Sequence, residues 1–214
     1  MKKIVLLIAL LVAGFALHGQ GQEAYIKAMS KGLTQMSSAG TLEEKQAVAS
    51  QFERIGAKVE GEWLPNYYAA LNYINMSFAA EGISIKDQYT SKAQEFIDIA
   101  IEVAPNNAEV VALQGFNYMT QIAADPNSRG QMLSGKAMQQ FSMAVRIDPE
   151  NPRAKMLLAQ MQIGMAQFFG SPIDQPCAMV KQTIPTFEAQ GAKQTIEPTW
   201  GKDMADGIVQ QCGK

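Results

Sequence analysis

The chain has 214 residues, with 18 Lys and Arg, 20 Asp and Glu and a single histidine, which gives a formal net charge of -2. A mildly acidic chain without basic runs is a poor candidate for nucleic-acid binding. The only histidine, His18, lies within or beside a segment that we expect to be removed. Catalytic triads and metal sites built on histidine are therefore excluded from the mature chain.

The N-terminus has the layout of a secretory signal peptide. Lys2 and Lys3 precede an uncharged stretch from Ile4 to Leu17, after which small and polar residues follow. A membrane span needs roughly 20 apolar residues, and neither this stretch nor any later one is long enough. We expect residues 1–21 to be cleaved, the net charge to become about -4, and the protein to be periplasmic or secreted without an integral membrane span.

The rest of the chain is predicted to be helical. Strand signals are scarce, whereas Ala, Gln, Met, Glu and Lys are frequent and apolar residues recur every three to four positions. Regular breaks leave roughly nine helical segments of about 14 to 20 residues. Three helix starts carry capping signals: Thr41 with Glu44, Asn106 with Glu109, and Asn151 before Pro152. The sequence therefore predicts an all-α protein.

Two segments share one spacing of small, large and helix-stopping residues. The positions are spaced four, three and five apart in both: Ala93, Ile97, Ala100 and Pro105, then Ala137, Phe141, Ala144 and Pro149. This pattern resembles the second helix of the tetratricopeptide repeat (TPR) family, and Gly115 and Tyr118 match its small and aromatic positions in the first helix. The resemblance covers about residues 87–169. It implies antiparallel helix pairs stacked as a short superhelical array.

The repeat is longer than the family's. Pro105 and Pro149 are 44 residues apart, whereas the TPR period is about 34, so we expect longer helices and a loop at residues 125–130. We expect one domain over residues 22–214, with degenerate helical repeats at 22–86, the TPR-like core at 87–169 and a C-terminal cap hairpin at 170–214. An unrelated α-helical domain with a coincidental Ala and Pro pattern is the alternative.

The two cysteines, Cys177 and Cys212, are expected to form a disulfide. An exported protein meets an oxidising compartment, where such pairs usually close. Helices from Cys177 to about Gln190 and from Thr199 to Cys212 have legs of about 14 residues, which rise roughly 20 Å each. An antiparallel hairpin therefore brings the cysteines together as a terminal cap. Free thiols or half of a metal site are the alternatives, and nothing nearby supplies further ligands.

Two polar helix faces are candidate binding surfaces. One carries Tyr68, Asn72 and Asn75 beside an apolar stripe of Trp63, Tyr67, Leu71, Ile74 and Phe78, and the next unit carries Gln114, Asn117 and Gln121. Because first helices of TPR units line the concave side, the resemblance implies a groove for an extended peptide or another helix at these six residues. Ordinary solvated surface is the competing interpretation.

The sequence indicates no catalytic residue, metal site or cofactor. Phosphate-binding glycine loops, nucleophile elbows and clustered metal ligands are absent from it. We interpret the chain as an exported TPR-like protein-binding or scaffolding module of the cell envelope with a protein or peptide partner. One alternative is a glycan hydrolase working through Glu60, Glu62 or Glu81, although none has an obvious partner carboxylate. A self-associating structural protein is the other, and the sequence does not set the oligomeric state.

Overall fold

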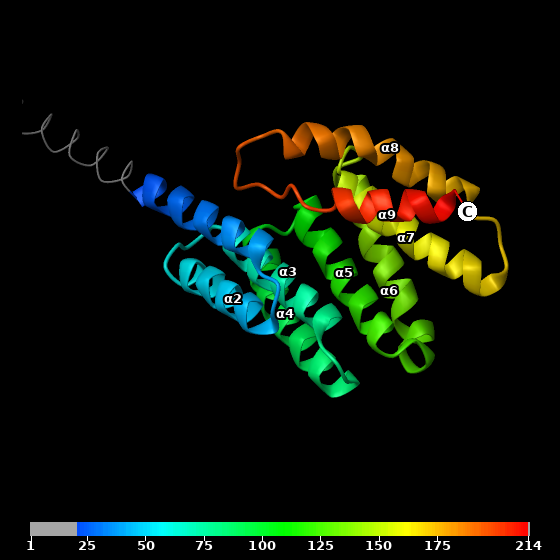
Figure 1. Cartoon of the computed structure of the whole chain (residues 1–214), viewed down its shortest axis with the longest axis horizontal. Helices are drawn as coiled ribbons and strands as arrows, with labels where there is room; N and C mark the ends of the chain where they lie inside the picture. Colours follow the sequence, from blue (N-terminus) through cyan, green and yellow to red (C-terminus); the bar gives the residue numbers. More distant parts are fainter. Residues whose placement is uncertain (1–20, 214) are drawn as a thin grey trace, which may run out of the picture.

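The computed structural model describes residues 21–213, so the expected signal peptide lies outside the described residues except for its last position. A helical segment at residues 21–38 is followed by eight helices (Figure 1). They are α2 (Leu42–Gly56), α3 (Leu64–Ala79), α4 (Ile83–Val103), α5 (Ala108–Ala124), α6 (Pro126–Ile147), α7 (Pro152–Phe169), α8 (Asp174–Gly191) and α9 (Lys202–Cys212). The described chain has no strand, and the all-α prediction is confirmed.

Two of the predicted helix starts are confirmed. Thr41 caps α2 through a hydroxyl that accepts the Glu44 amide at 3.2 Å, while the Glu44 carboxylate accepts the Thr41 amide at 3.0 Å. The Asn151 side chain accepts the Ala154 amide at 2.8 Å, and Pro152 is the first residue of α7. These starts fold as expected because each cap satisfies amides that the first helical turn leaves without partners.

Two local expectations were wrong. The cap of α5 is Asn107 and not Asn106, and its side-chain oxygen accepts the Glu109 amide at 2.9 Å. The Glu109 carboxylate, which a capping box would use, instead enters a buried ion pair described below. The loop expected at residues 125–130 is the first turn of α6, because Asp125 caps that helix and Pro126 occupies its first position.

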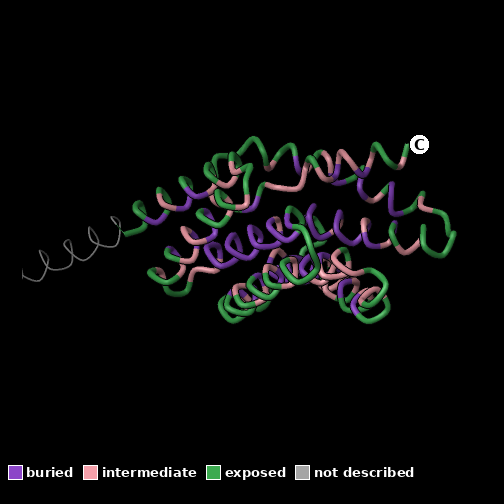
Figure 2. Tube along the Cα trace, turned by 60° about the horizontal axis from the view of Figure 1, so that its bottom comes forward, coloured by how far each residue is buried: buried purple, intermediate pink, exposed green. Residues whose placement is uncertain are grey.

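The helices form layers around a central row of α3, α5 and α7. At least half of the residues in each of these three helices are buried, whereas α4 and α6 have four buried residues each. Figure 2 shows the buried row between helices on one side and the C-terminal part of the chain on the other. We call the side of α3, α5 and α7 that faces away from α4 and α6 the inner face.

The repeated pattern packs as the resemblance implies. Its small and large apolar members are fully buried in α4 and α6: Ala93, Ile97, Ala100, Ala137, Phe141 and Ala144. Gly115 of α5 lies against the Phe141 ring so closely that an added Cβ would come within 2.6 Å of it. A small residue at this position lets α5 and α6 approach, which explains why the family position holds one.

The C-terminal hairpin closes the array. α8 packs on α7 and α9 packs on α8, and Cys177 and Cys212 are joined by the expected disulfide, with Cα atoms 5.9 Å apart. Between the two helices, residues 192–201 form an irregular connection that we call the strap. At the end of the strap, Gly201 adopts φ 109°, a conformation that favours glycine, and faces the Phe187 ring.

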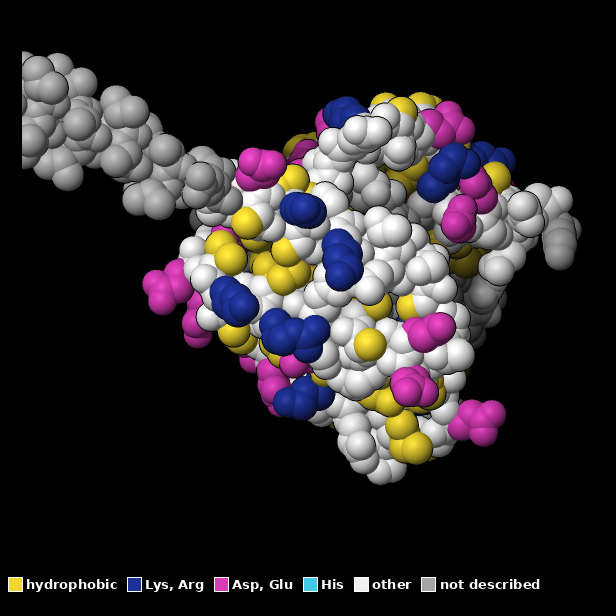
Figure 3. All heavy atoms as spheres, turned by 60° about the vertical axis from the view of Figure 1, so that its left-hand side comes forward, with side chains coloured by type: hydrophobic (Ala, Val, Ile, Leu, Met, Phe, Trp, Pro, Cys, Tyr) yellow, Lys and Arg dark blue, Asp and Glu magenta, His cyan; other side chains and the backbone are white. Residues whose placement is uncertain are grey.

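The described part of the molecule offers no helix that is both long and apolar enough to cross a membrane. One face carries Lys and Arg over its middle, Asp and Glu mostly toward its margin, and small apolar patches between them (Figure 3). Charges of both signs are thus present on this face.

Candidate binding site

The strap crosses the inner face and is hydrogen-bonded to the central row. The Tyr68 hydroxyl donates to the Ile196 carbonyl at 2.9 Å, and the Trp200 indole N–H donates to the Tyr67 hydroxyl at 2.8 Å. Arg153 donates to the Trp200 carbonyl at 3.1 Å. Three contacts from α3 and α7 therefore fix the strap at both its middle and its end.

A buried ion pair lies beneath the strap. Arg153, 2% exposed, pairs with Glu109, and its Nε lies 2.8 Å from both carboxylate oxygens while Nη2 lies 2.7 Å from one. Glu109 also accepts from the Tyr67 hydroxyl at 3.0 Å and from the Asn151 side chain at 2.6 Å. Because the partners are paired and hydrogen-bonded on several sides, this network joins α3, α5, α7 and the strap into one rigid unit.

Burial and charge shift the acidities in this network. Burial alone would lower the pKa of Arg153, but the hydrogen bonds and charge of Glu109 outweigh it and hold that pKa above its ordinary value. Burial raises the pKa of the Tyr67 hydroxyl well above its usual range, and the charge of Glu109 adds to the effect. Arg153 thus stays charged and Tyr67 stays neutral through the physiological range.

An aromatic row runs from α3 through α5 to the strap. The rings of Phe78 and Phe116 are 5.8 Å apart, and those of Phe116 and Trp200 are stacked at 5.7 Å with an interplanar angle of 16°. Phe116 is only 2% exposed, whereas Phe78 is 48% exposed and Trp200 is partly exposed. Phe78 was expected in the apolar core stripe, so its exposure leaves a large apolar ring facing solvent at one end of the row.

Three of the six predicted polar residues bond to neighbouring helices. Asn72 is buried and donates to the Lys45 carbonyl of α2. Gln114 and Asn117 are buried against α4, where both bond to the Gln94 side chain at 2.6 to 3.0 Å. Their amides thus tie consecutive helices together, and a partner at these positions would have to displace those bonds.

The other three predicted polar residues are arranged differently. Tyr68 is buried and holds the strap, and Asn75 and Gln121 are partly exposed. The structure therefore gathers the six onto α3 and α5 without making them one open groove. Partner binding by these residues stays a prediction.

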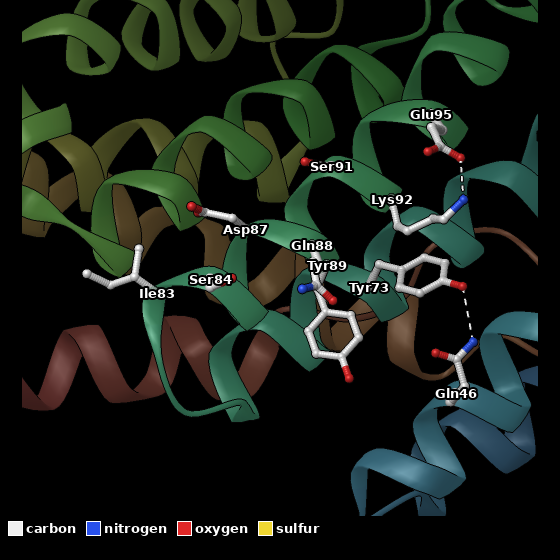
Figure 4. Close-up of a pocket in the computed structure, with 10 residues that line it drawn as sticks. All are labelled: Gln46, Tyr73, Ile83, Ser84, Asp87, Gln88, Tyr89, Ser91, Lys92 and Glu95. Atoms are coloured by element: carbon white, nitrogen blue, oxygen red, sulfur yellow. Dashed lines mark hydrogen bonds and ion pairs between the residues drawn. The ribbon is translucent and has the colours of Figure 1, made fainter.

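A hollow of about 1030 Å³ lies along α4 on its side toward α2 (Figure 4). Tyr89 projects into it and stacks with Tyr73 at 6.3 Å. The Tyr73 hydroxyl donates to Glu53 at 2.6 Å and accepts from Gln46 at 3.1 Å, and burial followed by the bond to Glu53 raises its pKa to about 12. Most polar groups in this hollow are already paired within the protein.

A second hollow of about 570 Å³ opens beside the strap at the starts of α5 and α7. Glu109, Arg153 and Glu197 are among its lining residues. Desolvation, followed by the charges of Glu109 and Glu62, raises the pKa of Glu197 above the ordinary carboxyl value. Within residues 21–213, no three His, Cys, Asp or Glu side chains gather in a way that could hold a metal ion.

Two of the carboxylates considered for hydrolysis, Glu60 and Glu81, are exposed. The third, Glu62, accepts a hydrogen bond from the Tyr25 hydroxyl at 3.3 Å. The residues that organise the inner face could not be recognised as site residues from the sequence patterns; they are Glu109, Arg153, Phe116 and Trp200. The signal that was available was Trp200, a large aromatic residue in an otherwise polar connection between two helices.

No known protein-family model matches the chain, and no curated protein matches it either. Two solved structures resemble it. The HusA haemophore from Porphyromonas gingivalis has a TM-score of 0.76 at 24% identity, over 87% of this chain and 91% of that chain. A thermophilic TPR protein from Thermus thermophilus has a TM-score of 0.57 at 15% identity, over 87% of this chain and 88% of that chain. These likenesses show a TPR-like helical fold shared with a haemophore.

Proposed function

We propose that this chain is an exported binding protein, without catalysis, that holds a planar and largely apolar ligand of the tetrapyrrole class on its inner face. The observation that carries the proposal is the aromatic row of Phe78, Phe116 and Trp200. Flat rings stack on aromatic side chains, and each such contact contributes about 0.5 to 1.5 kcal/mol beyond the area buried. A half-exposed Phe78 at the end of the row offers that surface.

The fold supports the same ligand class. A protein of closely similar architecture over nearly its whole length is a haemophore, and a haemophore carries haem. Cys177 and Cys212 are bonded, which fits the oxidising compartment in which an exported carrier works.

Ring contacts, and not a histidine ligand, account for binding in this proposal. Residues 21–213 contain no histidine, and we expect His18 to leave with the signal peptide. Metal-free protoporphyrin is therefore expected to bind about as tightly as haem.

The test is a spectroscopic titration of the oxidised chain with haem and with protoporphyrin. We expect saturable binding of both ligands. Phe78→Ala is expected to weaken the affinity roughly tenfold, which corresponds to a loss of about 1.4 kcal/mol in binding free energy. Phe168→Ala removes another exposed ring, 84% exposed at the end of α7, and is expected to leave the affinity unchanged. Equal affinity of the wild type and Phe78→Ala, or the absence of saturable binding, would refute the proposal.

A protein partner is the second candidate. The inner face already binds a non-helical segment, because Tyr68 and Arg153 donate to two carbonyls of the strap. Peptide ligands are held by hydrogen bonds to their main chain in the same way. The partly exposed Asn75 and Gln121 are the proposed contacts. A cross-linked pull-down from the cell envelope should lose its specific partner on Asn75→Ala/Gln121→Ala, and capture that is unchanged by these substitutions would count against this candidate.

A further inference from the structure

The aromatic row combines two separate parts of the chain. The helical array supplies Phe78 and Phe116, and the strap supplies Trp200, which bonds to Tyr67 from 133 positions away. Trp200 is partly exposed, so the buried Phe116 lies between the half-exposed Phe78 of α3 and the partly exposed Trp200 of the strap.

Trp200 is held in one orientation before any ligand arrives. Its indole N–H is bonded to Tyr67, its carbonyl is bonded to Arg153, and the Arg153 guanidinium lies 6.0 Å from the ring centroid. Arg153 is itself fixed by Glu109. A side chain restrained in this way loses little conformational freedom on binding. Almost all of the favourable free energy of its contact with a ligand therefore contributes to the affinity.

The disulfide helps to hold the strap in place. Residues 192–201 lie inside the loop that Cys177 and Cys212 close. α9, which continues from the strap, has 11 residues with only Ala205 and Ile208 buried among them, and packs mainly on α8. Without the disulfide, α9 would be held by this small apolar contact and by Gly201 against Phe187, and the hydrogen bonds of Trp200 to Tyr67 and Arg153 would have to hold the end of the strap with less support.

These observations carry one inference, which rests on the proposed function. We propose that Trp200 is a ligand-contacting residue of the inner-face site, and that the Cys177–Cys212 disulfide positions it. The site is then bipartite, with one wall on the array and one on the disulfide-tethered strap. Arg153 is a positioning residue that acts through Trp200.

The experiment compares affinities for protoporphyrin in the full oxidised chain and its variants. Loss of one aromatic contact predicts a roughly three- to tenfold weaker affinity for Trp200→Leu. Trp200→Phe keeps an aromatic ring, and its affinity for protoporphyrin is expected to lie between those of Trp200→Leu and the wild type. Cys177→Ser/Cys212→Ser is expected to weaken binding by a similar factor while the helical circular dichroism of the array is kept.

A structural control separates contact from stability. Phe141→Leu removes a fully buried aromatic ring that packs on α5 at Gly115, outside the aromatic row. This variant is expected to melt at a lower temperature and yet bind protoporphyrin with wild-type affinity at temperatures where it is folded. The inference is wrong if Phe141→Leu and Trp200→Leu both lose affinity in proportion to their loss of stability. The effect of Trp200 on binding would then be structural.

The outcomes distinguish the inference from the function on which it rests. If wild type binds and Phe78→Ala weakens binding, but Trp200→Leu and the double serine variant bind normally, the inference fails and the proposed function stands. If Trp200→Leu tightens binding, the strap competes with the ligand, and the inference is again wrong. If wild type does not bind, the proposed function fails and the inference fails with it.

Discussion

Gly115→Ala offers a sharp test of the packing between α5 and α6. An added Cβ would lie 2.6 and 2.7 Å from two atoms of the Phe141 ring and 3.1 Å from the Gln140 Cβ. Ordinary carbon contacts lie near 3.5 to 4.0 Å, so the ring must shift by roughly 1 Å. Phe141 is fully buried, and a close-packed interior resists such a shift.

Two opposing free-energy contributions determine the expected change in stability. Overpacking a core costs about 1 to 3 kcal/mol, and the size of this clash places it in the upper half of that range. Replacing a helical glycine with alanine returns about 1 kcal/mol. The net loss is then about 1 to 2 kcal/mol, which lowers the melting temperature by roughly 2 to 8 °C for a chain of this size.

Thermal unfolding followed by helical circular dichroism measures the effect, with Gly135→Ala as the matched control. Gly135 lies within α6, and a Cβ added there meets nothing within 4 Å, so that variant gains about 0.5 to 1 kcal/mol. The same substitution is therefore expected to destabilise the protein at position 115 and to stabilise it at position 135. In the Phe141→Leu background, Gly115→Ala should become less costly. If Gly115→Ala stabilises the protein as Gly135→Ala does, the close-packing argument is refuted.

Three further predictions concern stability. Arg153→Met leaves the buried carboxylate of Glu109 without its counter-charge and is expected to lower the free energy of unfolding in urea by about 3 to 5 kcal/mol. Adding Glu109→Gln should recover part of that loss. A double variant that is no more stable than Arg153→Met would contradict this. Reducing the Cys177–Cys212 disulfide is expected to lower the free energy of unfolding by about 4 kcal/mol in the chain-entropy estimate, which unfolding with and without reductant measures. Glu197 has a raised pKa in the folded protein, so its charged form disfavours folding and its contribution to stability decreases as pH rises from the ordinary carboxyl pKa through the raised value. Glu197→Gln should therefore be more stable than wild type at pH 7, with the difference shrinking as pH falls to about 4; a difference that grows toward acid would contradict the sign.

The periodic features of the fold could be predicted from the sequence because they depend on local rules. The spacing of Ala137, Phe141 and Ala144 determines which side of α6 is buried, and a cap such as Thr41 marks its helix start within a few residues. The disulfide was predicted from two helices expected to be equally long and from an oxidising compartment, and it forms although α8 has 18 residues and α9 has 11. Each of these inferences uses positions close together in the chain or a simple count of residues.

The candidate site could not be predicted in the same way, because it depends on contacts between distant residues. Glu109 looks like part of a cap in the sequence, but in the structure its carboxylate binds Arg153. The polar stripes were identified correctly as helix faces, yet spacing alone does not say whether a face meets solvent or another helix. Gln114 and Asn117 meet α4, and no periodicity distinguishes that outcome from an open groove.

The long separation between Tyr67 and Trp200 has a consequence for the order in which this protein matures. Contacts between consecutive helices form early because they close short loops, whereas a contact across 133 positions forms late. The bipartite site proposed above would be complete only after the strap has docked and Cys177 has bonded to Cys212. If that proposal holds, a chain folded under reducing conditions would reach its full affinity only after oxidation.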